Sequence, residues 1–237
     1  MSTQAAGARL EVHLLNTDAH DVGPAFRRNV ELEKNRSDMK DGFEVHNHFD
    51  GDTAKRAQQW LSQHGIKEDY GYVQTDLALL ELRKRGGCDF IHVTNGDNLY
   101  HVDFFRRHLD AMHDPTVVAT AVDFYCHHVK KFTEVAYRIG QIDLATQLFR
   151  AAYLDARNAT FVTGPYERDC KNQKCDLSAY FRKKLANVDW QNLDVDSEWS
   201  RLRIFNADGH FAKDISRDVG HAGRRAIHGH GPLLWHL

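Results

Sequence analysis

The stretch CDFIHVTNGDNLY, residues 88–100, passes from an apolar run into a polar turn that holds a carboxylate. Its first half, residues 88–94, is rich in the β-branched and aromatic residues of a buried strand. Residues 95–98, Asn-Gly-Asp-Asn, are of the types that dominate turns. The stretch therefore predicts a strand from the interior of a sheet that ends in an exposed polar turn.

Strands and helices alternate on both sides of this stretch. The expected strands are residues 10–15, 43–46, 116–122, 161–163 and 233–237, and residues 142–150 read as a strand followed by a helix. The expected helices are residues 52–61, 76–85, 100–112 and 208–215. Such alternation predicts an α/β fold, with a mostly parallel sheet flanked by helices on both faces. A chain of 237 residues fits one domain.

Composition narrows the class of partner. The formal net charge is −2, and acidic and basic residues are interleaved, so no long-range field gathers nucleic acid. We therefore expect no nucleic-acid partner. The first residues have no apolar core for a signal peptide, and no run is long enough for a transmembrane segment. The sequence predicts a cytoplasmic protein.

The polar turn is the best candidate for chemistry. In an open α/β sheet, ligands bind at the carboxyl ends of the strands, where the turn of residues 95–98 is expected to lie. A hard divalent cation that bridges phosphates needs oxygen ligands, and we predict Asp97 as a metal ligand assisted by Asn95 or Asn98. The alternative is an ordinary turn without a ligand, because the same residue types favour turns.

The order of motifs resembles that of the GT-A type glycosyltransferases, particularly family-2-like enzymes. In these a helix and a buried strand lead to a DxD motif, followed by an aromatic-rich helix, as in residues 75–105. Residues 50–54, Asp-Gly-Asp-Thr-Ala, resemble the tail of the loop after the second strand that holds the nucleotide. Residues 208–211, Asp-Gly-His-Phe, resemble the later acidic motif, and residues 234–236, Leu-Trp-His, the terminal motif whose histidine completes the metal site.

This resemblance implies a Rossmann-like GT-A fold, with a nucleotide-binding part of about residues 8–122 and an acceptor part of about residues 123–237. It implies an inverting transfer of a sugar from a nucleotide-sugar donor to a hydroxyl acceptor such as a glycan. The cofactor would be Mn²⁺ or Mg²⁺, held by Asp97 and His236. The implied donor-binding residues are Asn16, Asp50, Asp52, Asp76 and Asn95.

The catalytic base implied by the resemblance is Asp208, and Asp143 and Glu198 compete for that role. A helix N-cap is the alternative role for both Asp208 and Asp76. For His236 the alternative is a partly exposed side chain near the C-terminus. The first position of the metal motif is Asn95 where the family has Asp.

A second resemblance competes with the first. Residues 44–51, Glu-Val-His-Asn-His-Phe-Asp-Gly, are similar to the amidohydrolase signature, in which a His-x-His pair binds zinc. Histidines two apart on a strand, here His46 and His48, share a face and can chelate one ion. This second resemblance implies a zinc-dependent hydrolase. A third alternative for the function is a catalytically inactive nucleotide-sugar-binding protein. Further zinc ligands would come from His92, His127 or His230.

Overall fold

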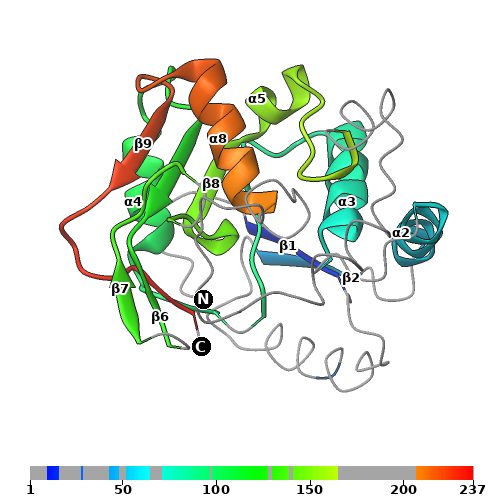
Figure 1. Cartoon of the computed structure of the whole chain (residues 1–237), viewed down its shortest axis with the longest axis horizontal. Coiled ribbons are helices and arrows are strands. Elements are labelled where there is room, and N and C mark those ends of the chain that lie inside the picture. Colours follow the sequence, from blue (N-terminus) through cyan, green and yellow to red (C-terminus); the bar gives the residue numbers. More distant parts are fainter. Residues whose placement is uncertain are drawn as a thin grey trace, which may run out of the picture.

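The computed structural model describes residues 10–15, 28, 43–47, 52–64, 71–96, 98–127, 130–138, 141–164 and 207–236. The described helices are α2 (Asp52–Gln63), α3 (Tyr72–Arg85), α4 (Phe104–Ala111), α5 (Ala151–Ala156) and α8 (Ala207–Val219), with a 3₁₀ turn, η2 (Leu144–Thr146). The described strands are β1 (Leu10–Leu14), β2 (Phe43–Asn47), β3 (Phe90–His92), β4 (Asn98–Tyr100), β5 (Ala119–Val122), β6 (Phe124–Cys126), β7 (Lys131–Thr133), β8 (Gln147–Arg150), β9 (Arg224–Ile227) and β10 (Leu234–His236). Their arrangement is shown in Figure 1.

These strands form three sheets. The parallel pair β1–β2 stands apart from two four-stranded sheets, with the orders β4-β10-β6-β7 and β3-β8-β5-β9. Each four-stranded sheet contains both parallel and antiparallel pairs. The protein is thus α/β, as predicted, but its two four-stranded sheets are mixed rather than mostly parallel.

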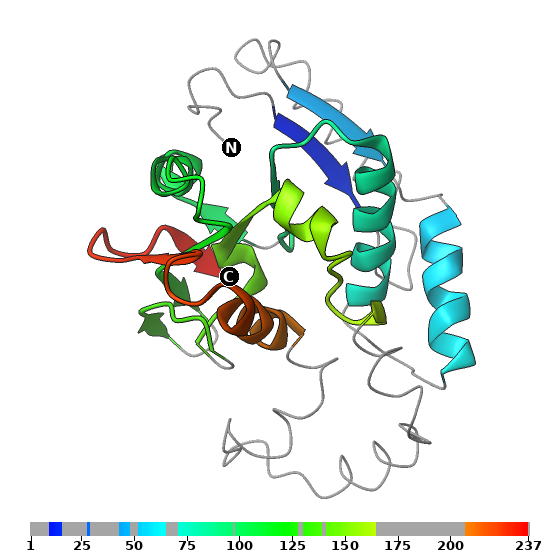
Figure 2. The same ribbon diagram turned by 90° about the horizontal axis from the view of Figure 1, so that it is seen from above.

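The two strands that follow α8 in the sequence, β9 and β10, pair with strands from the middle of the chain. β9 lies parallel to β5, and β10 is inserted between β4 and β6. The predicted nucleotide-binding and acceptor parts therefore share both four-stranded sheets. Figure 2 shows α2 beside α3, on the flank of the molecule that also carries β1 and β2.

Four expected elements differ from the structure. Residues 142–150, expected as a strand followed by a helix, form the 3₁₀ turn η2 and then the strand β8. The helix expected from residue 76 begins at Tyr72, after Gly71, whose φ of 79° favours glycine. The helix expected over residues 100–112 begins only at Phe104, because residues 98–100 pair with β10 as a strand. Residues 161–163, expected as a strand, donate their backbone N–H groups to a carboxylate instead.

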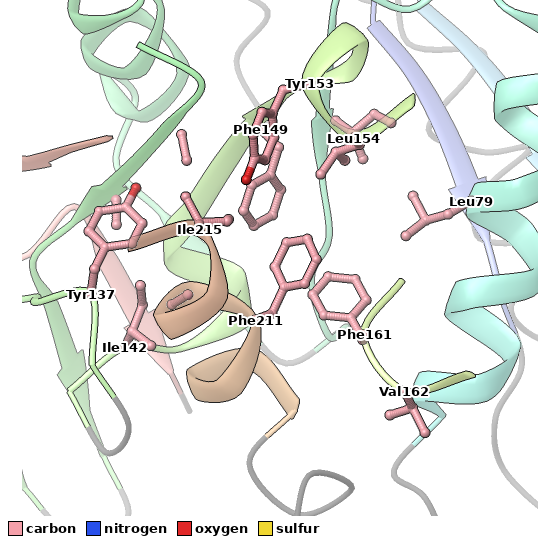
Figure 3. Packing of buried hydrophobic residues seen from close by; sticks show 14 of the residues in the cluster. Leu79, Tyr137, Ile142, Phe149, Tyr153, Leu154, Phe161, Val162, Phe211 and Ile215 are labelled. Atoms are coloured by element: carbon pink, nitrogen blue, oxygen red, sulfur yellow. The ribbon is translucent and has the colours of Figure 1, made fainter. Parts of the chain in front are cut away.

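The largest core lies between α8 and the sheet that contains β8. The Phe211 ring lies between those of Phe149 and Phe161, with ring centroids 5.3 and 4.5 Å away (Figure 3). Ile215, one helical turn after Phe211, is 2% exposed and faces the same cluster. Burying each of these side chains contributes about 1.5–3 kcal/mol to stability. This core fixes the sheet on which the candidate site is built.

No helix among the described residues is long and apolar enough to cross a membrane.

Candidate functional site

A chain of hydrogen bonds supports the polar turn from inside the protein. His92, at the end of β3, has its Nδ1 2.7 Å from the backbone oxygen of Gln147. Its Nε2 lies 3.3 Å from the hydroxyl of Tyr100, which in turn donates to Thr94 Oγ1. The network thus joins two strands of one sheet to β4 of the other, immediately beneath the turn.

The imidazole of His92 is neutral in this setting. Burial lowers the pKa of His92 from 6.5 to about 4, although the Gln147 carbonyl raises it. Since a carbonyl only accepts, Nδ1 carries the proton and Nε2 is an acceptor. The single hydroxyl proton of Tyr100 is therefore shared between His92 Nε2 and Thr94 Oγ1 and is not donated to both at once. The rings of Tyr100, Phe104 and Phe105 surround the imidazole, with centroids 5.5, 5.1 and 5.6 Å away.

A second histidine extends this polar interior. His108 on α4 is fully buried, and its Nδ1 lies 2.6 Å from Thr120 Oγ1. Burial, and secondarily the neighbouring His92, lowers the pKa of His108 well below its ordinary value. Two uncharged imidazoles therefore lie near each other in the interior, His92 on β3 and His108 between α4 and β5.

Asn98 closes the turn and leaves one atom unused. Its Nδ2 donates to Thr94 Oγ1 at 3.1 Å and to the backbone oxygen of Asn95 at 3.4 Å. Its Oδ1 is buried and has no hydrogen-bond partner among the residues that the structure describes. A buried acceptor without a donor is costly, so this oxygen is suited to receive a ligand. Asn95 itself is exposed, and Asp97 lies outside the described residues.

The last strand runs directly beside this turn. In the antiparallel β4–β10 pair, His236 is opposite Asn98, and in the parallel β6–β10 pair it is opposite Cys126. Leu234 is fully buried and packs with Phe104, which sets the register. The backbone of the terminal Leu-Trp-His motif is therefore adjacent to the turn that the sequence singled out. The side chain of His236 is outside the description.

The residues expected to hold the donor nucleotide are described only in part. β1 and β2 are parallel, with Leu14 opposite Asn47, so the two strands end side by side. Asn16 and Asp50, which follow these strands in the sequence, lie outside the described residues. Asp52 is the first residue of α2, and its side chain is not described.

Asp76, expected at the donor or as a helix cap, is fully buried inside α3. Its carboxylate accepts hydrogen bonds from the backbone nitrogens of Phe161, Val162 and Thr163 at 2.6, 2.8 and 2.8 Å. The Thr163 hydroxyl donates to it at 3.2 Å. Burial raises its pKa to about 6, against these donors, which lower it. Asp76 thus anchors the segment of residues 161–163 and has no surface for a ribose.

The candidates for the catalytic base fall into three situations. Asp208 is the second residue of α8, as expected for the start of a helix, and its side chain is not described. Asp143 caps η2, with its Oδ1 accepting from the backbone nitrogen of Ala145 at 2.8 Å. Glu198 lies outside the described residues.

The histidines proposed for a zinc site lie in separate environments. The backbone of His46 belongs to β2 and His48 lies outside the description, whereas His92 is enclosed as above and His127 and His230 are exposed. In the part of the chain that the structure describes, no three His, Cys, Asp or Glu side chains gather to hold a metal ion.

Sequence reasoning missed the residues that support the turn. Gln147 and Tyr100 were given no role, and His92 was considered only as a zinc ligand. Their connection depends on β8 pairing with β3 and on β4 pairing with β10, which residue spacing does not encode. The one available signal was a histidine within an apolar strand, since such a histidine needs a hydrogen-bond partner.

No protein-family model matches the chain, and no curated protein is similar to it in sequence.

Proposed function

We propose that this protein is a glycosyltransferase that moves a sugar from a nucleotide-sugar donor to an acceptor hydroxyl, with the help of a divalent cation. The observation that supports the proposal is the pairing of β10 with β4, which lays His236 opposite Asn98. The terminal motif and the Asn-Gly-Asp-Asn turn are far apart in sequence, and the resemblance to GT-A enzymes needs them together.

The oxygen donors of the turn fit a hard cation. Asn98 Oδ1 is buried without a partner among the described residues, one residue after the carboxylate of Asp97. We assign Asp97, Asn98 and His236 to Mn²⁺ or Mg²⁺. The oxygens of Asp97 and Asn98 match the preference of these cations for oxygen donors. The bound cation would supply charge that stabilises the diphosphate leaving group. The network of His92, Tyr100 and Thr94 would hold the turn in place.

The resemblance to GT-A enzymes suggests the residues that bind the donor and the residue that acts as the base. Asn16, Asp50, Asp52 and Asn95 would contact the donor. Asp208 would accept the proton of the acceptor hydroxyl. The acceptor oxygen then forms a bond to the anomeric carbon, and the bond from that carbon to the nucleoside diphosphate breaks, with the electron pair leaving on the diphosphate oxygen. We propose that the fold is a GT-A variant whose two four-stranded sheets are mixed.

Binding measurements test this function directly. We expect a UDP- or GDP-sugar to raise the melting temperature only when Mn²⁺ is present, because a ligand specific for the folded state stabilises it. Asp97→Ala should abolish that shift. Asp89→Ala is the control, because Asp89 is an exposed carboxylate just before β3, whereas Asp97 follows β3. No shift with any nucleotide sugar, or equal shifts in the two variants, would contradict the proposal.

Turnover then separates an enzyme from a binding protein. Asp208→Asn should retain donor binding and lose sugar transfer and hydrolysis. Retained turnover in this variant would exclude Asp208 as the base. Stoichiometric zinc in the purified protein, lost in a His46→Ala, His48→Ala double variant, would instead support the hydrolase.

A further inference from the structure

A buried carboxylate holds a half-exposed histidine at the edge of the β4-β10-β6-β7 sheet. Asp123, between β5 and β6, is 2% exposed, and its Oδ1 accepts from His228 Nδ1 at 2.7 Å. The same oxygen accepts from the backbone nitrogen of Val135 at 2.9 Å, and the Asp123 carbonyl accepts from that of Leu233 at 3.0 Å. Asp123 is therefore fixed by two other segments, and it fixes His228 in turn.

The hydrogen bond to Asp123 determines which ring nitrogen of His228 faces a ligand. Its Nδ1 is the donor to Asp123, so in the neutral imidazole Nε2 is an acceptor with a set direction. The side chain is 48% exposed. It lines a surface hollow of about 550 Å³ formed by β7, residues 134–136, Arg138 and Gln141. Figure 1 shows β7 at the outer edge of its sheet.

The lining combines an exposed aromatic ring with several planar polar groups. Phe132 is 42% exposed and lines the hollow. Glu134, Arg138 and Gln141 also line the hollow, and the Arg138 guanidinium donates to the Gln141 side-chain oxygen. Charges of both signs are present, because Lys131 and Arg138 lie with Glu134, so the lining does not select a simple anion.

This chemistry matches a sugar ring. One face of a pyranose presents C–H groups that pack on an aromatic ring, and its hydroxyls both donate and accept hydrogen bonds. A hollow of this volume is in the range of small-ligand sites. We infer that the hollow binds a carbohydrate, which stacks on Phe132 and donates a hydroxyl proton in a hydrogen bond to His228 Nε2. On the proposed transferase function, on which this last step rests, the bound sugar is the acceptor.

Two pairs of side chains allow a matched test. Leu99 is 55% exposed in the same sheet, and His230 is exposed two residues after His228, yet neither lines the hollow. Free mono- and disaccharides, among them glucose, galactose, mannose, N-acetylglucosamine and lactose, would be titrated into the full-length protein and followed by NMR chemical shifts. We expect binding of at least one sugar, weakened about fivefold or more by Phe132→Ala and by His228→Ala. Leu99→Ala and His230→Ala should bind as the wild type does.

The outcomes are separable. If no sugar perturbs the resonances of residues 131–138, or if Phe132→Ala binds as tightly as Leu99→Ala, the inference is wrong. If inorganic phosphate binds and abolishes the chemical-shift changes that the sugar causes, the inference is also wrong, since the hollow would then be an anion site. Sugar binding without any nucleotide-sugar binding would support the carbohydrate site and contradict the transferase function. Nucleotide-sugar binding without sugar binding would contradict only the carbohydrate site.

Discussion

Asn98 and His236 are directly opposed in the antiparallel pair of β4 and β10, although they begin and end strands at distant points of the chain. This pairing joins the polar turn to the C-terminal strand. It depends on Leu234, the buried first residue of β10, because a slip of one residue would turn every side chain to the other face.

The register of β10 depends on Leu234, which is fully buried. Leu234→Ala should lower the free energy of unfolding by about 2–5 kcal/mol, because it leaves a cavity between the sheet and α4. Chemical denaturation measures this. His236→Ala, at the end of the same strand, should change stability by less than about 1 kcal/mol. A Leu234→Ala variant as stable as the wild type would contradict the packing described for β10.

The unpartnered oxygen of Asn98 predicts an unequal contribution of the two asparagines to metal binding. Asn98→Ala should weaken Mn²⁺ binding about tenfold or more, because Oδ1 is buried beside the turn and has no other partner among the described residues. Asn95→Ala should weaken it less, since that side chain is exposed. Electron paramagnetic resonance of free Mn²⁺ gives both affinities. An equal loss in the two variants would argue against Asn98 as the assisting residue.

Tyr100 connects His92 to Thr94 through its hydroxyl. Tyr100→Phe keeps the ring in the apolar cluster and removes that connection, so stability should fall by about 1 kcal/mol. The matched control is Tyr125→Phe in β6, which should be close to neutral. Both are measured by chemical denaturation. If the two substitutions have the same effect, the hydroxyl network does not support the turn.

The low pKa of His92 predicts an acid-dependent loss of stability. Burial lowers its pKa in the folded protein to about 4, whereas the unfolded value is 6.5. Between these values the unfolded chain binds more protons, so the contribution of neutral His92 is present above pH 6.5 and is lost as the pH falls toward 4. The full difference is on the order of 3 kcal/mol.

This effect is read from a difference between two proteins, since other groups titrate in the same range. The free energy of unfolding of the wild type minus that of His92→Gln should decrease as the pH is lowered from 6.5 to 4. A difference that stays constant across that range would show that His92 is not held neutral by burial.

Asp76 should behave as a structural anchor. Asp76→Ala leaves the backbone N–H groups of Phe161, Val162 and Thr163 without their acceptor, and we expect a loss of about 3 kcal/mol. Asp155→Ala is the control in the neighbouring segment. Its carboxylate is 48% exposed and makes only an ion pair with Arg83, so the loss should stay below about 1 kcal/mol.

The pH dependence of Asp76 has the opposite sign to that of His92. Its folded pKa of about 6 is above the ordinary 3.8, so its protonated form is favoured by folding. Its titration contributes stability that is present below pH 3.8 and is lost as the pH rises through 6. The stability of the wild type relative to Asp76→Asn should therefore decrease from pH 4 to pH 6. An increase over that range would contradict the burial of this carboxylate.

Local patterns in the sequence were enough to find most of the described elements. The apolar runs predicted β1, β2, β3 and β5, and the caps and basic last turn predicted α2, α3 and α8. They succeeded because hydrophobic periodicity and end signals act between residues close in the chain. They also singled out the turn of residues 95–98 and the terminal Leu-Trp-His motif.

Only the tertiary structure decided which strands pair. β9 carries Arg224 and Arg225 and has no strand-like pattern, yet it lies beside the buried β5, and β4 is a strand because β10 returns to it. The same holds for Asp76, whose sequence context suggested a helix cap and whose partners are the nitrogens of residues 161–163. Strand pairing and buried hydrogen bonds join residues far apart in the chain. The free energy of these hydrogen bonds depends on how completely the folded protein shields the bonded groups from water. The sequence by itself therefore determined the elements and the candidate turn, while packing determined its neighbours.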